Sequence, residues 1–100
     1  MIKHIILWTL KDTLNDLEKN EVKLNIKKEL EALTSKIPGI ISLEVNINGI
    51  DGSTADLMLD SSFDSIESLK SYAVNPLHVE VANTYVRPYT AIRDALDYEK

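Results

Sequence analysis

Apolar residues alternate with other residues through three separate stretches of the chain. Residues 2–10 are rich in β-branched and aromatic side chains and carry large apolar groups on both faces of the alternation. Residues 40–48 alternate cleanly, and residues 55–63 follow turn signals at Asn48-Gly49 and Asp51-Gly52. Alternation with a period of two is typical of β-strands. We therefore expect three strands, with a hairpin connection between the second and the third.

Between the first two strands, residues 16–37 place apolar side chains at helical spacing among many charged ones. The apolar stripe consists of Val22, Ile26, Leu30, Leu33 and Ile37. Asn15 followed three residues later by Glu18 is a capping-box pattern, and Pro38-Gly39 is a helix-ending signal. These features predict one long amphipathic helix.

After the third strand the pattern predicts a helix broken in two and then a last strand. Asp64 is a candidate cap for a short helix over residues 65–73, and Asn75-Pro76 favours an immediate restart. Arg87-Pro88 ends that second helix. Residues 89–98 fit either a strand or a helix, and we expect a strand.

This order of elements predicts an α+β domain with the ferredoxin-like β-α-β-β-α-β pattern, its second helix broken in two. We expect one domain over residues 1–100, with a four-stranded antiparallel sheet and both helices on one face. We assign five large apolar side chains to the other, uncovered sheet face. They are Ile6, Trp8, Leu57, Leu59 and Phe63. An apolar face of that size is too large to stay wet, so we expect a homodimer that closes two sheets face to face.

Composition and charge exclude several classes of protein. Sixteen acidic against eleven basic residues give a net charge of -5, which has the wrong sign for a nucleic-acid binder. The absence of cysteine excludes a disulfide scaffold and a thiol nucleophile. No apolar run approaches the ~18–20 residues that cross a bilayer. We therefore expect a cytoplasmic protein without a membrane or nucleic-acid partner.

Two side chains near the helix break are candidates for catalysis. His78 lies about one turn into the helix that starts at Asn75-Pro76, where the helix N-terminus would lower its pKa and keep it neutral as a general base. Tyr72, six residues earlier, could donate a hydrogen bond to a developing enolate oxygen. A packing interpretation stays open for both, with the imidazole bound to the backbone and the phenol at the edge of the core.

His4 is a polar group on an apolar strand face, which it shares with Ile6 and Trp8. A buried histidine needs hydrogen-bond partners, so His4 belongs either to the core or dimer interface or to a ligand pocket. His4 and His78 show no metal-ligand spacing. Motifs that cradle phosphate or a dinucleotide are absent from the sequence, and we expect no metal and no cofactor.

Several segments together resemble the stress-responsive alpha/beta-barrel (Dabb) domain family over nearly the whole chain. They are Met1–Leu7, Lys36–Ile40, Leu43–Val45, Ala55–Leu59, Phe63–Val81, Val86–Pro88 and Asp97–Glu99. The resemblance implies a dimeric alpha/beta barrel. In a plant cyclase of this family, a tyrosine and a histidine at positions matching Tyr72 and His78 act in a cavity, and a histidine matching His4 lies beside them. Leu57 replaces a further cavity histidine, and Asn75 stands where the family often has histidine.

Two functions follow as hypotheses. The first is a cofactor-free cyclase, isomerase or lyase acting on a small hydrophobic carbonyl compound, with His78 as base and Tyr72 as hydrogen-bond donor. Its substrate would lie between the first helix and the sheet, against His4 and the apolar side chains that we assign to binding. Those are Ile6, Trp8, Leu57 and Leu59. The second is a non-catalytic homodimer that binds a ligand or has a stress-related structural role.

Overall fold

The computed structural model describes all residues 1–100. Its strands and α-helices are β1 (Ile2–Leu10), α1 (Asp16–Glu31), β2 (Ile40–Asn46), β3 (Leu57–Phe63), α2 (Ile66–Val74), α3 (Pro76–Val81) and β4 (Thr90–Glu99). Short 3₁₀ turns follow α1 and precede β4, at Ala32–Ser35 and Arg87–Tyr89. A π-helical turn, Ala82–Val86, continues α3. No helix combines the length and apolar character that spanning a membrane requires.

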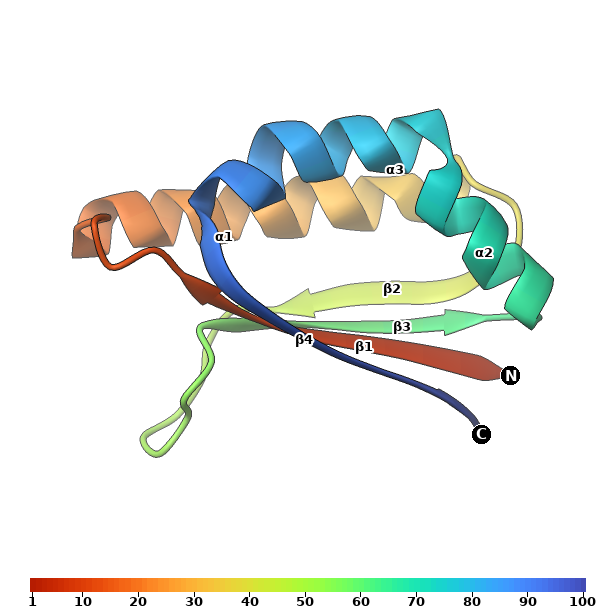
Figure 1. Cartoon of the computed structure of the whole chain (residues 1–100), viewed down its shortest axis with the longest axis horizontal. Helices are drawn as coiled ribbons and strands as arrows, with labels where there is room; N and C mark the ends of the chain where they lie inside the picture. The colour runs from red at the N-terminus through yellow and green to blue at the C-terminus, as the bar shows by residue number, and fades with distance from the viewer.

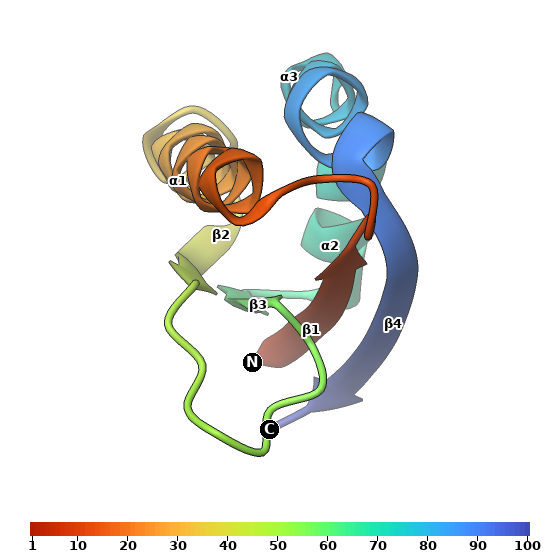
Figure 2. The ribbon, with the colours of Figure 1, turned by 90° about the vertical axis from the view of Figure 1, so that its left-hand side faces the viewer.

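The four strands form one antiparallel sheet in the order β2-β3-β1-β4. All helices lie on one face of this sheet, with α1 over β2 and the α3 segment above β4 (Figures 1 and 2). The first and last strands pair along their whole length, so the two chain ends meet, and Lys100 N–H donates to the Met1 carbonyl at 2.9 Å. The ferredoxin-like α+β fold with its broken second helix is confirmed.

Local capping explains where the helices begin. Asn15 and Glu18 form the predicted reciprocal capping box at α1, at 2.8 and 3.0 Å. At α2 the predicted cap, Asp64, is wrong by one residue. Ser65 is the last residue with extended backbone, and its hydroxyl accepts the Ser68 N–H at 3.1 Å. Asn75 caps α3, as predicted, by accepting the Leu77 N–H at 2.9 Å.

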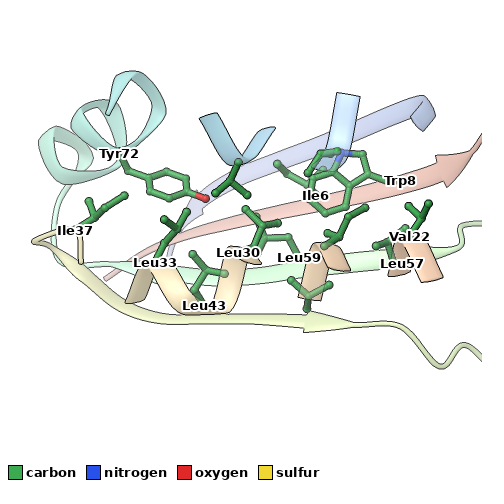
Figure 3. Packing of buried hydrophobic residues seen from close by; sticks show 14 of the residues in the cluster. Ile6, Trp8, Val22, Leu30, Leu33, Ile37, Leu43, Leu57, Leu59 and Tyr72 are labelled. Atoms are coloured by element: carbon green, nitrogen blue, oxygen red, sulfur yellow. The ribbon is translucent and has the colours of Figure 1, made fainter. Parts of the chain in front are cut away.

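The core lies between the sheet and the helices, and it corrects one expectation (Figure 3). The five apolar residues that we assigned to the uncovered sheet face belong to the buried core instead. Ile6, Trp8, Leu57, Leu59 and Phe63 are all at most 5% exposed within the single chain. Strand β1 carries large apolar groups on both faces, so alternation alone does not tell which face the helices cover. These residues therefore cannot form the dimer face.

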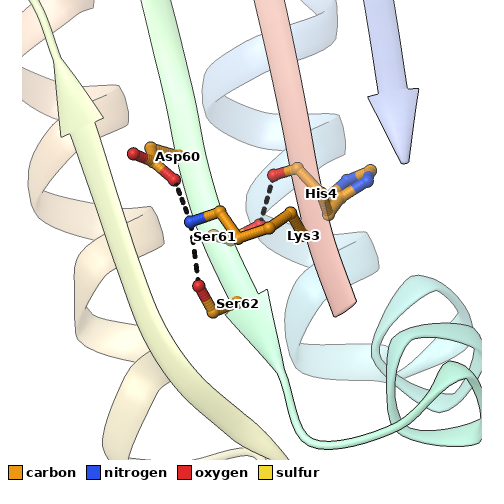
Figure 4. Close-up of polar contacts among 5 residues, drawn as sticks. All are labelled: Lys3, His4, Asp60, Ser61 and Ser62. Carbon is orange, nitrogen blue, oxygen red and sulfur yellow. Dashed lines mark hydrogen bonds and ion pairs between the residues drawn. The ribbon is translucent and has the colours of Figure 1, made fainter. Parts of the chain in front are cut away.

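The opposite sheet face, here called the open face, is only partly apolar. Its exposed or half-buried apolar side chains are Ile5, Leu7, Met58, Ile92 and Leu96. Beside them Lys3 donates to Asp60 at 2.6 Å and to Ser62 at 2.9 Å (Figure 4). The open face is thus a modest apolar patch next to a polar network, and His4 points to the other side of β1.

Candidate functional site

A cavity of about 800 Å³ lies between the β1–β4 half of the sheet and the segment from α2 to the turn before β4. Eighteen residues line it, and ten of them are hydrophobic when Tyr72 and Tyr98 are counted as such; Ile2, Ile6, Trp8, Leu69 and Val86 are among the ten. The polar lining groups are His4, Lys70, Tyr72, His78, Arg87, Thr90, Arg93, Asp97, Tyr98 and Glu99. An apolar cavity of this size with a few polar side chains is typical of small-molecule sites.

Tyr72 reaches from α2 into the interior of the molecule (Figure 3). Its side chain is 1% exposed and packs against Phe63, with the ring centroids 5.0 Å apart. Its hydroxyl is buried and has no hydrogen-bond partner in the chain. Burial raises the pKa of the Tyr72 phenol above its ordinary value, so the group stays protonated. Tyr72 therefore offers a hydrogen-bond donor that no protein group uses.

His78, in the first turn of α3, lies directly beside this phenol. The two ring centroids are 4.2 Å apart and the planes are inclined by 36°. His78 Nδ1–H donates to the Ala73 carbonyl at 3.2 Å, because a carbonyl oxygen only accepts. That bond fixes the tautomer in which Nε2 carries the lone pair.

The pKa of His78 is lowered from its ordinary value, mainly because burial disfavours the imidazolium ion. The nearby cationic groups Arg87 and Arg93, together with His4, lower this pKa further, while the bond to Ala73 opposes the shift. A lowered pKa is what we predicted for His78. The predicted cause, the helix N-terminus, is not the dominant one, because burial has the largest effect.

His4 forms a pair that the sequence analysis missed. Its Nδ1–H donates to the carboxylate of Asp97, which stands directly opposite it on β4. The His4 ring is 6.5 Å from that of Tyr72 and inclined by 68°. A carboxylate bound to one ring nitrogen orients the imidazole and leaves the other nitrogen for a ligand. No sequence motif marks Asp97, because only the register of β1 and β4 brings it to His4.

Five of the seven predicted site residues line the cavity. They are His4, Ile6, Trp8, Tyr72 and His78. Leu57 and Leu59 do not, because they lie on β3, where they pack in the core beneath α1 and are 3% and 1% exposed. No residue of α1 lines the cavity, which lies between β1 and β4 on one side and the segment from α2 to the turn before β4 on the other. The cavity is therefore not where we predicted one, between the first helix and the sheet.

Arg87 and Arg93 also line the cavity and were not predicted as site residues. Arg87 begins the 3₁₀ turn before β4, and Arg93 stands opposite Trp8 in the β1–β4 register. Nowhere in the structure do three or more histidine or acidic side chains gather in a way that could hold a metal ion. The site is therefore an imidazole–phenol pair with a second, carboxylate-bound imidazole and two guanidinium groups.

Solved structures of similar shape come from several organisms. A dimeric protein of unknown function with a ferredoxin-like fold from Bacteroides fragilis is 35% identical, with a TM-score of 0.92 over 99% of this chain and 95% of that one. A Dabb family protein from Mesorhizobium loti is 22% identical, with a TM-score of 0.76 over 99% and 95% of the two chains. A hydroxynitrile lyase from Passiflora edulis is 17% identical, with a TM-score of 0.75 over 97% and 90%.

A search of curated proteins found no match. The sequence profile of the stress responsive A/B barrel domain, Dabb, matches residues 2–100 and thus nearly the whole chain. The chain therefore belongs to the stress responsive A/B barrel domain (Dabb) family.

Proposed function

We propose that this protein is a cofactor-free enzyme that removes a proton from a small hydrophobic carbonyl compound, in a cyclisation, isomerisation or lyase reaction. One observation carries the proposal. Tyr72 and His78 lie side by side on one cavity, and the Tyr72 hydroxyl is buried without a partner. A buried donor without an acceptor is costly, and the carbonyl oxygen of a substrate would supply the missing acceptor.

His78 is the proposed general base. Its Nδ1–H is held by the Ala73 carbonyl, so Nε2 is the basic atom, and the lowered pKa keeps it unprotonated at neutral pH. In the proposed step, Nε2 takes the proton from the carbon next to the substrate carbonyl. The electron pair of the C–H bond moves into the enolate, and the imidazolium later returns the proton to product or leaving group.

Tyr72 is the proposed stabiliser of the enolate oxygen. Because the pKa of its phenol is raised, it donates a hydrogen bond without losing its proton. A donor fixed in a buried site acts on developing charge more strongly than the same donor in water. The His4–Asp97 pair, whose imidazole ring lies near the Tyr72 ring, is proposed to position the bound substrate.

The apolar lining of the cavity supports a hydrophobic substrate. Ile6 and Trp8 form part of its floor on β1, and Val86 closes it from the helical side. The Passiflora edulis relative, named a hydroxynitrile lyase, indicates that this fold can carry a lyase, although at 17% identity the likeness extends to the fold alone.

Proton abstraction can be tested without knowing the natural substrate. The protein is incubated in D₂O with 1-phenylbutane-1,3-dione and related aryl ketones, and exchange of the acidic C–H is followed by NMR. We expect exchange faster than the buffer rate, and its loss in His78→Gln and in Tyr72→Phe. Tyr85→Phe is the matched control, because Tyr85 does not line the cavity.

Absence of any accelerated exchange across the panel would overturn the enzyme proposal. Shifts of the cavity amides on addition of the same ketones would then favour the second hypothesis, a non-catalytic ligand-binding protein. Unchanged exchange in both variants would remove His78 and Tyr72 from the proposed roles.

We infer that the protein is a homodimer that associates through the open face. The Bacteroides fragilis relative, 35% identical over 99% of this chain, is described as dimeric. The apolar side chains of the open face, with Leu7 40% and Leu96 64% exposed, are the residues that a second copy would cover. Sedimentation at micromolar concentration tests this inference, and a single species of 11.3 kDa would contradict it.

A further inference from the structure

We propose that the ligand of the cavity carries a carboxylate group, which Arg87 and Arg93 bind, on an otherwise apolar body that contains the reacting carbonyl. This proposal rests on the proposed function, because it takes the same cavity as the substrate site. It adds the class of the substrate, an apolar keto acid.

The first observation is how the cationic side chains are distributed. The chain contains nine lysines and only two arginines, and both arginines line the cavity. Of the lysines, Lys70 alone contributes to the lining. The guanidinium group presents a planar set of donors that matches a carboxylate, whereas a lysine ammonium is a point charge. The residue type suited to bidentate carboxylate binding thus occurs in this protein at the cavity and nowhere else.

The second observation is that the two arginines have no acidic partner in the chain. The ion pairs of the structure are Lys3–Asp60, His4–Asp97 and Lys27–Glu31. Arg87 Nη1 donates to the side-chain oxygen of Asn83, which orients the group while leaving other N–H donors free. Asp97, which lies four residues after Arg93 on the same face of β4, is bound by His4. Both guanidinium groups are therefore available to a ligand.

The third observation concerns the sign and size of the local charge. The cavity is lined by three cationic side chains, Lys70, Arg87 and Arg93, and by two acidic ones, Asp97 and Glu99. Counted over these five side chains alone, the lining carries one net positive charge, in a chain whose own net charge is -5. A single excess positive charge favours a monoanion such as a carboxylate over a doubly charged phosphate ester.

The same two arginines act on the proposed base. Both lower the pKa of His78, so their charges lie within electrostatic range of its imidazole. Arg93 also stands opposite Trp8, the largest apolar residue of the cavity floor. A ligand with its carboxylate at the arginines therefore has its apolar body over β1 and beside the Tyr72–His78 pair.

A matched pair of ligands tests this. The acid is 4-oxo-4-phenylbutanoate and the neutral analogue is its primary amide, which has the same body and the same ketone. Each is titrated into the ¹⁵N-labelled protein at low salt, and amide shifts give the affinity and confirm the fold of each variant. We expect the acid to bind about tenfold more tightly, the effect of one good charge-assisted interaction.

Variants assign the preference to the arginines. Arg93→Gln and Arg87→Gln should each weaken binding of the acid severalfold and leave binding of the amide unchanged. Lys36→Gln removes the same charge from an exposed position outside the cavity and should alter neither affinity.

The outcomes separate this proposal from the proposed function. Equal affinity for acid and amide at the cavity residues overturns the carboxylate preference and leaves the cavity as the substrate site. A preference for the acid that persists in both arginine variants overturns the assignment to Arg87 and Arg93. Binding of neither ligand at the cavity overturns the carboxylate proposal, and the H/D exchange experiment then decides the proposed function independently.

Discussion

Tyr72→Phe should stabilise the protein while abolishing its proposed activity. The substitution removes one oxygen atom that is buried and has no hydrogen-bond partner in the chain. It keeps the aromatic ring of a residue that is 1% exposed, and this ring packs between Phe63 and His78, at centroid distances of 5.0 and 4.2 Å. The change therefore isolates the hydroxyl from the packing of the side chain.

The expected gain follows from the cost of burying an unpaired hydroxyl, about 1–3 kcal/mol in protein substitution data. The cavity of about 800 Å³ beside Tyr72 has room for water, so part of that cost is recovered in the free protein. We therefore expect a gain of about 1 kcal/mol in the free energy of unfolding, from the low end of that range. For a domain of this size that corresponds to a rise of about 4–8 °C in the melting temperature.

The assay is urea unfolding followed by circular dichroism, with every variant at the same protein concentration because the inferred dimerisation would contribute to apparent stability. Tyr85→Phe is the control, since its hydroxyl is not among the buried groups without a partner; it should change the unfolding free energy by less than about 0.5 kcal/mol. H/D exchange is measured on the same samples. A more stable but inactive Tyr72→Phe protein is the pattern of a residue kept for function at the expense of stability.

A decrease of about 1 kcal/mol or more in the free energy of unfolding of Tyr72→Phe, the size of a lost hydrogen bond, would show that the Tyr72 hydroxyl has a partner in the folded protein. It would thereby refute the premise that the hydroxyl is reserved for a ligand. A stabilised variant that still exchanges at the wild-type rate would instead keep the structural reasoning and remove Tyr72 from catalysis.

Three further predictions concern pH, assembly and the second imidazole. The pKa of His78 in the folded protein lies below its ordinary value of 6.5, so the unfolded chain binds the proton first as pH falls. The free energy of unfolding should therefore decline below about pH 6.5 and level off beneath the folded pKa. In urea unfolding at a series of pH values, His78→Gln should flatten this part of the profile. Leu7→Asp on the open face should give a folded monomer by sedimentation, whereas Trp8→Asp, in the core, should unfold the chain. Asp97→Asn should slow H/D exchange at least severalfold with little change in melting temperature, and an unchanged rate would remove the His4–Asp97 pair from substrate positioning.

The sequence predicts the fold well because local patterns determine most of it. The capping box at Asn15 and the restart at Asn75-Pro76 fix where helices begin, and the alternation fixes the strands. The orientation of β1 is not decided locally, since Ile5 and Leu7 on one face are nearly as apolar as Ile6 and Trp8 on the other. Only packing against the helices settles which face is buried, and for that reason the residues predicted for the uncovered face are wrong.

The site is predictable to the extent that its residues are close in sequence. Tyr72 and His78 are six residues apart across a helix break, and a sharp corner between two short helices brings their rings together. Asp97 and Arg93 reach the site through the pairing of the first strand with the last, over more than eighty residues of chain. A shift of one residue in that register would turn both side chains to the open face, and no pattern in the sequence specifies the register.

The π-helical turn Ala82–Val86 has a consequence for how the cavity can be altered. A π-turn accommodates more residues than an α-helical turn, and each residue of an α-helix advances the side-chain direction by about 100°. Deletion of the exposed Thr84 would let residues 82–86 adopt ordinary α-helical geometry. It would thereby rotate Arg87 by about 100° around the helix axis relative to His78. Substitution of single side chains that line the cavity would thus leave His78 and Arg87 in the same relative position. Changes in the length of this segment, rather than in its side chains, are what would separate the base from its neighbouring cation.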